Sequence, residues 1–565
     1  MMRPTLLFTA LLLVGCEGSI VGPPGLGPPG AGNGGGGIGG GTGGGTTQPA
    51  ELGLVGIRRL NRVQYENALR ALFPGTIGTT LVAQTSYPSA SPKTGLASGF
   101  SSDSDNGTVS TQDEILLEDG SEFMAAAFMT NASSLLPQLC PSLAPGFTDA
   151  QVDACVGGFI DDFGRRAFRR PLTATERTNI NALYTTLRVE QSAAESFSAV
   201  LQYFFQAPAF IYRPEKGTGT TGVVALTSHE LATRLAFLLT DAPPDATLLA
   251  LADDGTLSDP AVLHAQAERL LGATLTQATL GRFVREWLRV DLLESIDDMD
   301  PNLPAARRDA LLAEVEALTR NSWSPTRGSM VELFTTQQMA LEAQTDDLYG
   351  APNQGGAGSF NLVTRTDRRG ILSSAGFLIA HAPAGHQTPI IRGAFVRKEV
   401  LCQPLATLPG NIDINAPLND TRGLPTARER LSPTTTRGEC SGCHRDINPL
   451  GFALERYDAL GRFRTTENGA TIDTSGSINF PITGEQWDFT DGDAFLATAG
   501  ASAMTSSCAT QRYFRFALGR QLLPSELPYL PALNARVNET GGSVQSFVFP
   551  LLESEAFTSF RREEP

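Results

Sequence analysis

Apolar residues recur at helical spacing along most of the chain. Asn61 stands at an N-cap position ahead of one apolar stripe, and Pro74 ends that stripe. Leu231, Leu235 and Leu238 share one face of another. Further stretches with this period lie within residues 114–215, 265–292, 494–522 and 544–557. The pattern predicts a mainly α fold built from several helical segments.

A different pattern interrupts the helices after residue 440. Asn468-Gly469 joins two short runs, Phe463-x-Thr465 and Thr471-x-Asp473. An Asn-Gly pair favours the tight turn of a β-hairpin, because both residues tolerate the positive φ angles that this turn requires. We therefore expect a multidomain, mainly helical protein with short β-hairpins in this segment.

The first fifty residues show neither pattern. Residues 1–16 contain a short apolar stretch and then Leu13-Val14-Gly15-Cys16, which resembles a bacterial lipobox. This predicts a lipoprotein signal peptide that is cut ahead of a lipid-modified Cys16; an ordinary signal peptide with an incidental cysteine is the alternative. Residues 17–50 are rich in glycine and proline, so we expect a disordered tether there.

Breaks in the helical pattern divide the rest of the chain into five segments. A Gly/Thr stretch at 217–222 and a glycine-rich stretch at 351–360 mark two of the breaks. The segments are a small N-terminal helical domain (51–112), two further helical domains (113–216 and 222–350), a domain with a cysteine motif (361–482) and a C-terminal helical domain (488–562).

Composition and charge exclude several classes of protein. The chain has 565 residues, of which 41% are apolar and 18% are charged, which excludes a wholly disordered chain and a multi-span membrane protein. Lys and Arg number 43 against 59 Asp and Glu, so the net charge is -16. Because this charge repels a phosphate backbone, nucleic acid is not an expected partner.

The sequence Cys440-Ser441-Gly442-Cys443-His444 is a C-x-x-C-H motif, which is the attachment sequence of c-type haem. Two thiols at this spacing can each form a thioether with one vinyl group of a haem. The adjacent imidazole is then held against the iron as an axial ligand. We therefore expect one covalent haem c at Cys440 and Cys443, with His444 on the iron.

Two other interpretations of this motif remain open. Cys440 and Cys443 can form a redox-active or structural disulfide beside an unrelated histidine. They can also belong to a zinc or other metal site that Cys402 or Cys508 completes. In both cases the motif binds no haem.

The cysteine count favours haem. Of the seven cysteines, Cys16 is assigned to lipid, and Cys440 and Cys443 are assigned to haem. The remaining four are Cys140, Cys155, Cys402 and Cys508. An even number can pair in an exported protein, and we expect the first two to pair with each other and the last two likewise. Spacing alone does not fix this connectivity, so both disulfides are hypotheses.

No residue stands out as the second axial ligand of the iron. The candidates are His381, His386 and Met504. Each has a simpler interpretation as a core or solvent-facing residue. Arg462 and Arg464 are candidates to pair with haem propionates, because guanidinium geometry suits carboxylates. A surface ion pair with Asp458 is the alternative for these arginines.

Several longer strings resemble one family. In the N-terminal half they are Arg59-Leu60-Asn61-Arg62, Arg165-Arg166-Ala167-Phe168-Arg169-Arg170 and Leu226-Thr227-x-x-Glu230-Leu231. In the C-terminal half they are Pro389-x-x-Arg392-Gly393, Cys440-x-x-Cys443-His444-x-x-Ile447-Asn448-Pro449-x-Gly451 and Arg512-Tyr513-x-x-Phe516-Ala517. Together they resemble secreted bacterial multidomain proteins of unknown function, often called planctomycete-type cytochrome-c-associated proteins. The resemblance implies one mostly helical evolutionary unit with the haem motif in its fourth segment, and it implies no reaction.

These observations favour a cell-envelope lipoprotein that carries one c-type haem and transfers electrons in the periplasm or at the cell surface. The expected partners are the membrane, through the lipid at Cys16, and a redox partner protein. One alternative is an envelope binding or scaffold protein in which the C-x-x-C-H motif is a disulfide or metal site. Another is a haem oxidoreductase with an unknown substrate, so the sequence leaves open whether the protein is an enzyme.

Overall fold

The computed structural model describes residues 57–73, 75, 78–79, 82, 99–103, 110–296, 300, 302–351, 358–382, 389–405, 423–436, 438–523 and 526–562. All of them belong to one compact unit, Ala50–Pro565. The predicted signal peptide with Cys16 and the glycine-rich segment 17–50 lie outside the described residues.

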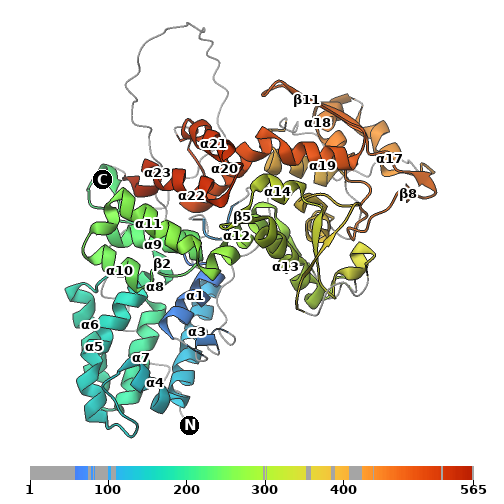
Figure 1. Cartoon of the computed structure of the whole chain (residues 1–565). Coiled ribbons are helices and arrows are strands. Elements are labelled where there is room, and N and C mark those ends of the chain that lie inside the picture. The colour runs from blue at the N-terminus through green and yellow to red at the C-terminus, as the bar shows by residue number, and fades with distance from the viewer. Residues whose placement is uncertain are drawn as a thin grey trace, which may run out of the picture. The chain divides into compact units, whose positions relative to one another are not determined.

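The N-terminal part of the described chain is a helical bundle (Figure 1). Its elements are β1 (Arg58–Arg59), α1 (Arg62–Leu72), α3 (Thr111–Thr130), α4 (Ala132–Leu139), α5 (Asp149–Phe168), α6 (Ala174–Leu187), α7 (Ala193–Gln206), α8 (Pro208–Ile211) and β2 (Tyr212–Arg213), which pairs with β1. The predicted cap of α1 is confirmed, because the Asn61 side-chain oxygen accepts the Gln64 N–H at 2.9 Å. Helix α7 packs against α3, α5 and α6, so it lies at the centre of the bundle.

This bundle has its own hydrophobic core. The rings of Phe159 and Phe197 are buried with centroids 4.2 Å apart, and other buried phenylalanines surround them. A single cluster contains most of the buried apolar residues between Leu60 and Ile211, and Phe237 of the next segment joins it, whereas Phe100 belongs to the second core. The predicted segments 51–112 and 113–216 therefore share one core among the described residues, while the boundary between them stays a prediction.

A second set of helices follows in the chain. The helices are α9 (Ser228–Thr240), α10 (Ala246–Asp253), α11 (Pro260–Leu271), α12 (Thr274–Trp287), α13 (Ala305–Ser322) and α14 (Met330–Thr335), with 3₁₀ turns η2 (Thr256–Ser258), η3 (Val290–Ser295) and η4 (Asp346–Tyr349). Two short antiparallel pairs, β4 (Trp323–Ser324) with β5 (Arg327–Gly328) and β6 (Gln338–Leu341) with β7 (Asn361–Thr364), lie beside them.

The remaining segment carries the cysteine motif and the C-terminal helices. Its first elements are η5 (Ile371–Ser373), α15 (Ala375–Ala380), α16 (Pro389–Phe395), the π-helical turn η7 (Val396–Val400), α17 (Ala427–Thr435), η8 (Gly438–Cys440) and α18 (Ser441–Phe452). Two hairpins follow, β8 (Thr466–Glu467) with β9 (Ala470–Thr471) and β10 (Gly476–Phe480) with β11 (Glu485–Phe489). The last elements are α19 (Gly492–Ala501), α20 (Ala503–Leu518), α21 (Tyr529–Glu539), α22 (Val544–Leu552), α23 (Glu555–Thr558) and β12 (Ser559–Arg562).

The predicted hairpin turn is confirmed, but its strands, Thr466–Glu467 and Ala470–Thr471, lie closer to the turn than the two runs of the sequence pattern. Thr466 pairs with Thr471 and Glu467 with Ala470, so two residues form the loop between the strands. Those two residues, Asn468 and Gly469, have φ angles of 48° and 83°. Positive φ at both positions is what a two-residue turn requires to match the twist of its strands.

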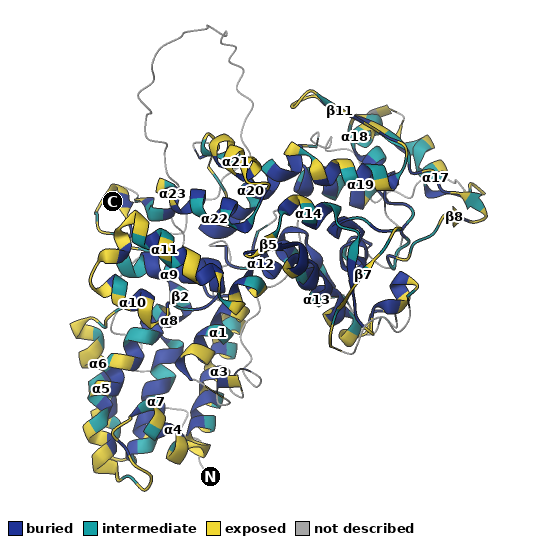
Figure 2. Ribbon diagram, in the orientation of Figure 1, coloured by how far each residue is buried: buried dark blue, intermediate teal, exposed yellow. Residues whose placement is uncertain are grey.

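The second core runs through the rest of the described chain. Buried residues from the predicted segments 222–350, 361–482 and 488–562 form one cluster, and Figure 2 shows them on the inner faces of these helices. Strand β12 closes this part by pairing antiparallel with β3 (Gly222–Ala225), with buried Phe560 opposite buried Val224. No described helix combines the length and apolar character needed to cross a bilayer. The mainly helical fold class is confirmed.

Candidate functional site

The C-x-x-C-H motif lies at the start of helix α18. Cys440 is the N-cap of this helix, and Cys443 and His444 lie in its first turns. Residues three apart in a helix lie on the same face, so both sulfur-bearing side chains project from one side of α18. All three side chains are half-buried, which leaves them accessible from outside the core.

The imidazole of His444 is held by the next turn of the same helix. Its Nδ1 lies 3.0 Å from Oδ1 of Asn448, and Asn448 is itself buried. A carboxamide oxygen can only accept a hydrogen bond, so Nδ1 carries the ring proton. The lone pair of a neutral ring is then on Nε2, which is the nitrogen that remains for a metal ion.

Helix α18 crosses α16 at close range. A Cβ atom on Gly451 of α18 would overlap the carbonyl oxygen of Pro389, and a Cβ atom on Gly393 of α16 would overlap the carbonyl oxygen of Ile447. Both glycines are therefore needed for the backbones to touch. This crossing fixes the position of the motif helix on the core.

Arg392 lies on α16 at this crossing, and its side chain holds the segment that follows α18. Its guanidinium is fully buried and donates to the carbonyl oxygens of Tyr457 at 2.8 Å and of Leu378 and Asp458 at 2.9 Å. Burial lowers the pKa of Arg392 to about 10, so the side chain stays charged at neutral pH. The Pro-x-x-Arg-Gly string therefore supports the motif helix.

A second contact with α18 comes from the π-helical turn η7. Arg397 of this turn forms an ion pair with Asp446 of α18 at 3.0 Å, two residues beyond His444. Arg397 is also tied to the following turn, because its Nε donates to the Pro404 carbonyl and its own carbonyl accepts the Gln403 N–H. The motif helix is thus anchored to η7 as well as to α16.

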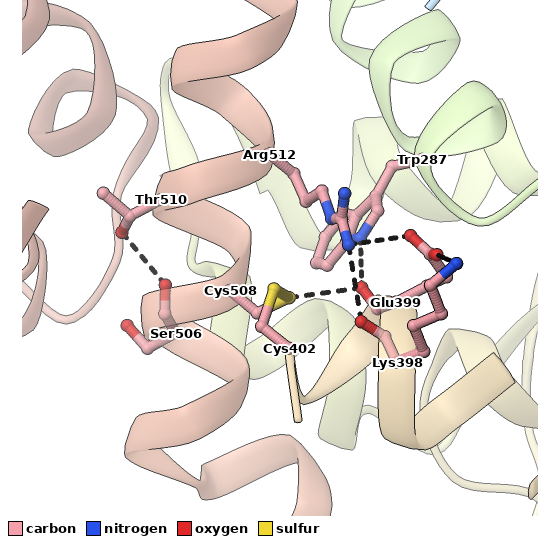
Figure 3. Close-up of a disulfide and its surroundings, with 8 residues drawn as sticks. All are labelled: Trp287, Lys398, Glu399, Cys402, Ser506, Cys508, Thr510 and Arg512. Atoms are coloured by element: carbon pink, nitrogen blue, oxygen red, sulfur yellow. Dashed lines mark hydrogen bonds and ion pairs between the residues drawn. A yellow bond between two sulfur atoms is a disulfide. The ribbon is translucent and has the colours of Figure 1, made fainter. Parts of the chain in front are cut away.

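The described residues form two disulfides, and these are the two pairs that we hypothesise from the sequence. Cys402 is joined to Cys508 of α20, and Figure 3 shows this bridge beside Glu399 and Trp287. The Glu399 carbonyl accepts the Trp287 indole N–H at 2.8 Å and lies 3.2 Å from the sulfur of Cys508. A disulfide sulfur has no proton, so the second contact is one of packing. The bridge ties the turn after η7 to the C-terminal helices.

The other disulfide lies in the N-terminal bundle, where it joins Cys140 at the end of α4 to Cys155 in α5. Cys440 and Cys443 lie outside both disulfides.

The zinc interpretation loses its expected ligands in this structure. Cys402 and Cys508 are oxidised, and a disulfide sulfur does not supply the thiolate that zinc requires. Within the part of the chain that the structure describes, no three His, Cys, Asp or Glu side chains converge as a metal site would need.

Two of the three candidates for the second axial ligand of the iron lie in the described part of the chain, and both make other contacts. His381 is buried, its Nε2 lies 2.9 Å from the Leu288 carbonyl oxygen, and burial lowers its pKa to about 4. The sulfur of buried Met504 accepts the Thr483 hydroxyl at 3.7 Å. His386 lies outside the described residues. Both described candidates are therefore core residues.

The two arginines considered for haem propionates pair with protein carboxylates. Arg462 lies 3.4 Å from Asp347, and Arg464 lies 3.8 Å from buried Glu455. Asp458 instead uses its side chain to accept the backbone N–H of Arg462 at 2.8 Å, which closes a turn. Sequence reasoning did not identify Asn448 as a contact of His444, although its spacing of four residues on a helix was the available signal.

Three family models match the chain, each described as a protein of unknown function. PSD5 (DUF1595) matches residues 155–215, PSD4 (DUF1592) matches 226–351, and PSCyt3 (DUF1588) matches 368–467, which includes helix α18. The chain belongs to this multidomain family of unknown function. No curated protein and no solved structure matches the chain. The family membership that the sequence strings imply is therefore confirmed, and it assigns no reaction.

Proposed function

We propose that this protein carries one covalent c-type haem in the cell envelope and transfers electrons to or from a redox partner. The observation that carries the proposal is the geometry of His444. Its Nδ1 is engaged by Asn448, so its Nε2 is the ring nitrogen available to iron. Metal-bound histidines in proteins are commonly held in this way through their other ring nitrogen.

The two cysteines fit the covalent attachment. Cys440 and Cys443 are half-buried, and both lie outside the two disulfides. Each S–H can add across one vinyl C=C bond, with the sulfur bonded to one carbon and the hydrogen to the other. A bound haem supplies a one-electron iron couple. His444 would supply the axial nitrogen, and α16 and η7 hold the helix that contains Cys443 and His444 and that Cys440 caps.

The envelope location rests on the sequence before residue 50. A lipid on Cys16, joined to the described unit through residues 17–50, would keep that unit beside a membrane without a transmembrane helix. Cys16→Ser tests this part of the proposal, because the variant should move from the membrane fraction to the soluble fraction after export. Wild-type protein that is wholly soluble would contradict the lipid anchor and would leave the haem assignment standing.

The haem assignment is tested in a host with c-type cytochrome maturation machinery. Wild-type protein should show a c-type pyridine haemochrome spectrum and a polypeptide mass increased by one haem. Cys440→Ala and Cys443→Ala should each reduce covalent haem staining, and the double variant should abolish it. His444→Ala should disturb the iron ligation.

A matched control separates the motif from the other cysteines. The double variant Cys402→Ser/Cys508→Ser should keep covalent haem, because both residues lie outside the motif. Wild-type protein without added haem mass and with a disulfide between Cys440 and Cys443 would instead support the binding or scaffold alternative.

A further inference from the structure

We propose that Asn448 and Thr435 are positioning residues that fix the tautomer of His444 and tune the haem iron through it. The inference rests on the proposed function for its redox consequence. The effect on the tautomer of His444 does not depend on haem. The observation is a chain of three hydrogen bonds that runs from the imidazole of His444 through Asn448 to helix α17.

The hydrogen bonds determine which way the Asn448 amide points. The Thr435 hydroxyl has one proton, and it donates that proton to the Leu431 carbonyl at 2.8 Å. Thr435 Oγ1 can therefore only accept from Asn448, so the amide NH₂ must face it, and Nδ2 lies 2.8 Å away. The amide oxygen is then left facing His444, where it accepts the Nδ1–H.

Burial makes this arrangement costly to change. Asn448 is 6% exposed and Thr435 is 3% exposed, so water does not compete for either side chain. A flipped amide would place its NH₂ against the ring N–H of His444 and its oxygen against a hydroxyl with no proton to give. Unpaired buried polar groups cost roughly 1–3 kcal/mol each.

The consequence for iron concerns the donor strength of Nε2. A good acceptor on Nδ1–H pushes electron density into the ring and makes Nε2 a stronger donor, which favours Fe(III) over Fe(II). Asn448→Asp should therefore lower the reduction potential, because a carboxylate is a stronger acceptor than an amide. Asn448→Leu should raise the potential, because it removes the acceptor.

Thr435 is the sharper test, because it does not contact the ring of His444 and acts on it only through Asn448. Thr435→Val removes the group that orients the amide and should shift the potential in the same direction as Asn448→Leu, by a smaller amount. Thr435→Ser keeps the hydroxyl and should restore the wild-type potential. Thr436→Val is the matched control, since Thr436 is the exposed C-cap of the same helix and donates to the Ser432 carbonyl at 2.7 Å.

A second measurement does not need haem. Full-length protein made without maturation machinery and labelled with ¹⁵N at histidine reports the tautomer of each ring by NMR, and His444→Gln identifies the signal. Wild type, Thr435→Ser and Thr436→Val should show the proton on Nδ1 of His444. Asn448→Leu should show it on Nε2, the nitrogen that a solvent-exposed imidazole prefers, and Thr435→Val should show a mixture. Thermal unfolding confirms that each variant is folded.

The two measurements separate the inference from the proposed function. A wild-type His444 with its proton on Nε2 overturns the inference, and so does a tautomer that is the same in Asn448→Leu, in Thr435→Val and in wild type. Equal potentials in all haem-loaded variants also overturn it. Absence of haem from wild-type protein contradicts the proposed function, and the tautomer result then still decides whether the residues position His444.

Discussion

Glu314 shows what burial does to a single charged residue in this protein. The side chain is fully buried on α13, where the Tyr349 hydroxyl and the Gly376 N–H, at 3.0 Å, hydrogen-bond to its carboxyl group. Burial raises the pKa of Glu314 to about 7, even though these hydrogen bonds and nearby Arg368 favour the ionised form. At this residue desolvation outweighs hydrogen bonding and charge pairing.

This shift makes the stability of the protein depend on pH. Between an ordinary pKa of 4.5 and the folded value of about 7, folded Glu314 holds a proton that the unfolded chain has lost. Stability due to this group is therefore greatest at low pH and falls as pH rises through that window, by at most about 1.4 kcal/mol per pH unit. Glu314→Gln should flatten the decline, as measured by urea unfolding from about pH 5 to about pH 8.

Glu316→Gln makes the same chemical change at a partly exposed position of α13 and controls for the substitution itself. If the pH slope of Glu314→Gln equals that of wild type, the raised pKa is wrong.

At the scale of elements, helix α18 combines a tight crossing with an exposed start. Gly451 touches the backbone of α16, whereas a Cβ atom on Gly442 would have no neighbour within 4 Å. The two glycines therefore have opposite roles in one helix. Gly451 permits packing, and Gly442 only lowers helix propensity.

A pair of alanine substitutions tests this difference. Gly451→Ala should lower the free energy of unfolding by roughly 1–3 kcal/mol or more, because the new methyl group overlaps the Pro389 carbonyl. Gly442→Ala should be neutral or should stabilise by about 0.5–1 kcal/mol through helix propensity. Chemical denaturation of the haem-free protein measures both, and equal effects of the two substitutions would contradict the close crossing.

The sequence predicts helix caps and tight turns well because the signals for them are local. The Asn61 cap and the Asn468-Gly469 turn depend on hydrogen bonds and φ angles within a few residues. The π-helical form of η7 and the crossing at Gly393 depend on distant segments. Neither follows from the periodicity of the apolar residues.

At the scale of the whole molecule, long-range links hold the second core together. The Cys402–Cys508 disulfide spans 106 residues of sequence, whereas Cys140–Cys155 spans 15. A cross-link over a longer loop removes more entropy from the unfolded chain. The first disulfide therefore constrains the unfolded chain more.

We expect unequal costs when the disulfides are removed. Cys402→Ser/Cys508→Ser should lower the free energy of unfolding by roughly 3–5 kcal/mol, and Cys140→Ser/Cys155→Ser should lower it by roughly 2–3 kcal/mol. Guanidinium unfolding of the two double variants provides the comparison, with each serving as the other's control. A larger loss from the short loop would contradict the entropic argument.

The strand pair at the C-terminus is a second long-range link. A chain that ends at Thr558 loses β12 and the burial of Phe560 against Val224. It should be less stable than wild type by roughly 3–5 kcal/mol, which is the cost of losing one buried aromatic side chain. A chain that ends at Arg562 keeps β12 and is the control, and thermal melting compares the two. Identical melting temperatures would show that β12 does not contribute to the stability of the fold.

The sequence by itself determined the helical class, the Asn61 cap, the Asn468-Gly469 turn and the C-x-x-C-H motif, because each is encoded by residues a few positions apart. Tertiary structure decided which segments share a core, which carbonyl oxygens accept from Arg392 and which cysteines are joined. It also placed Thr435 against Asn448, across 13 residues and two helices. Such contacts depend on how whole elements pack, and the free energy of packing comes from surfaces that meet only in the folded chain.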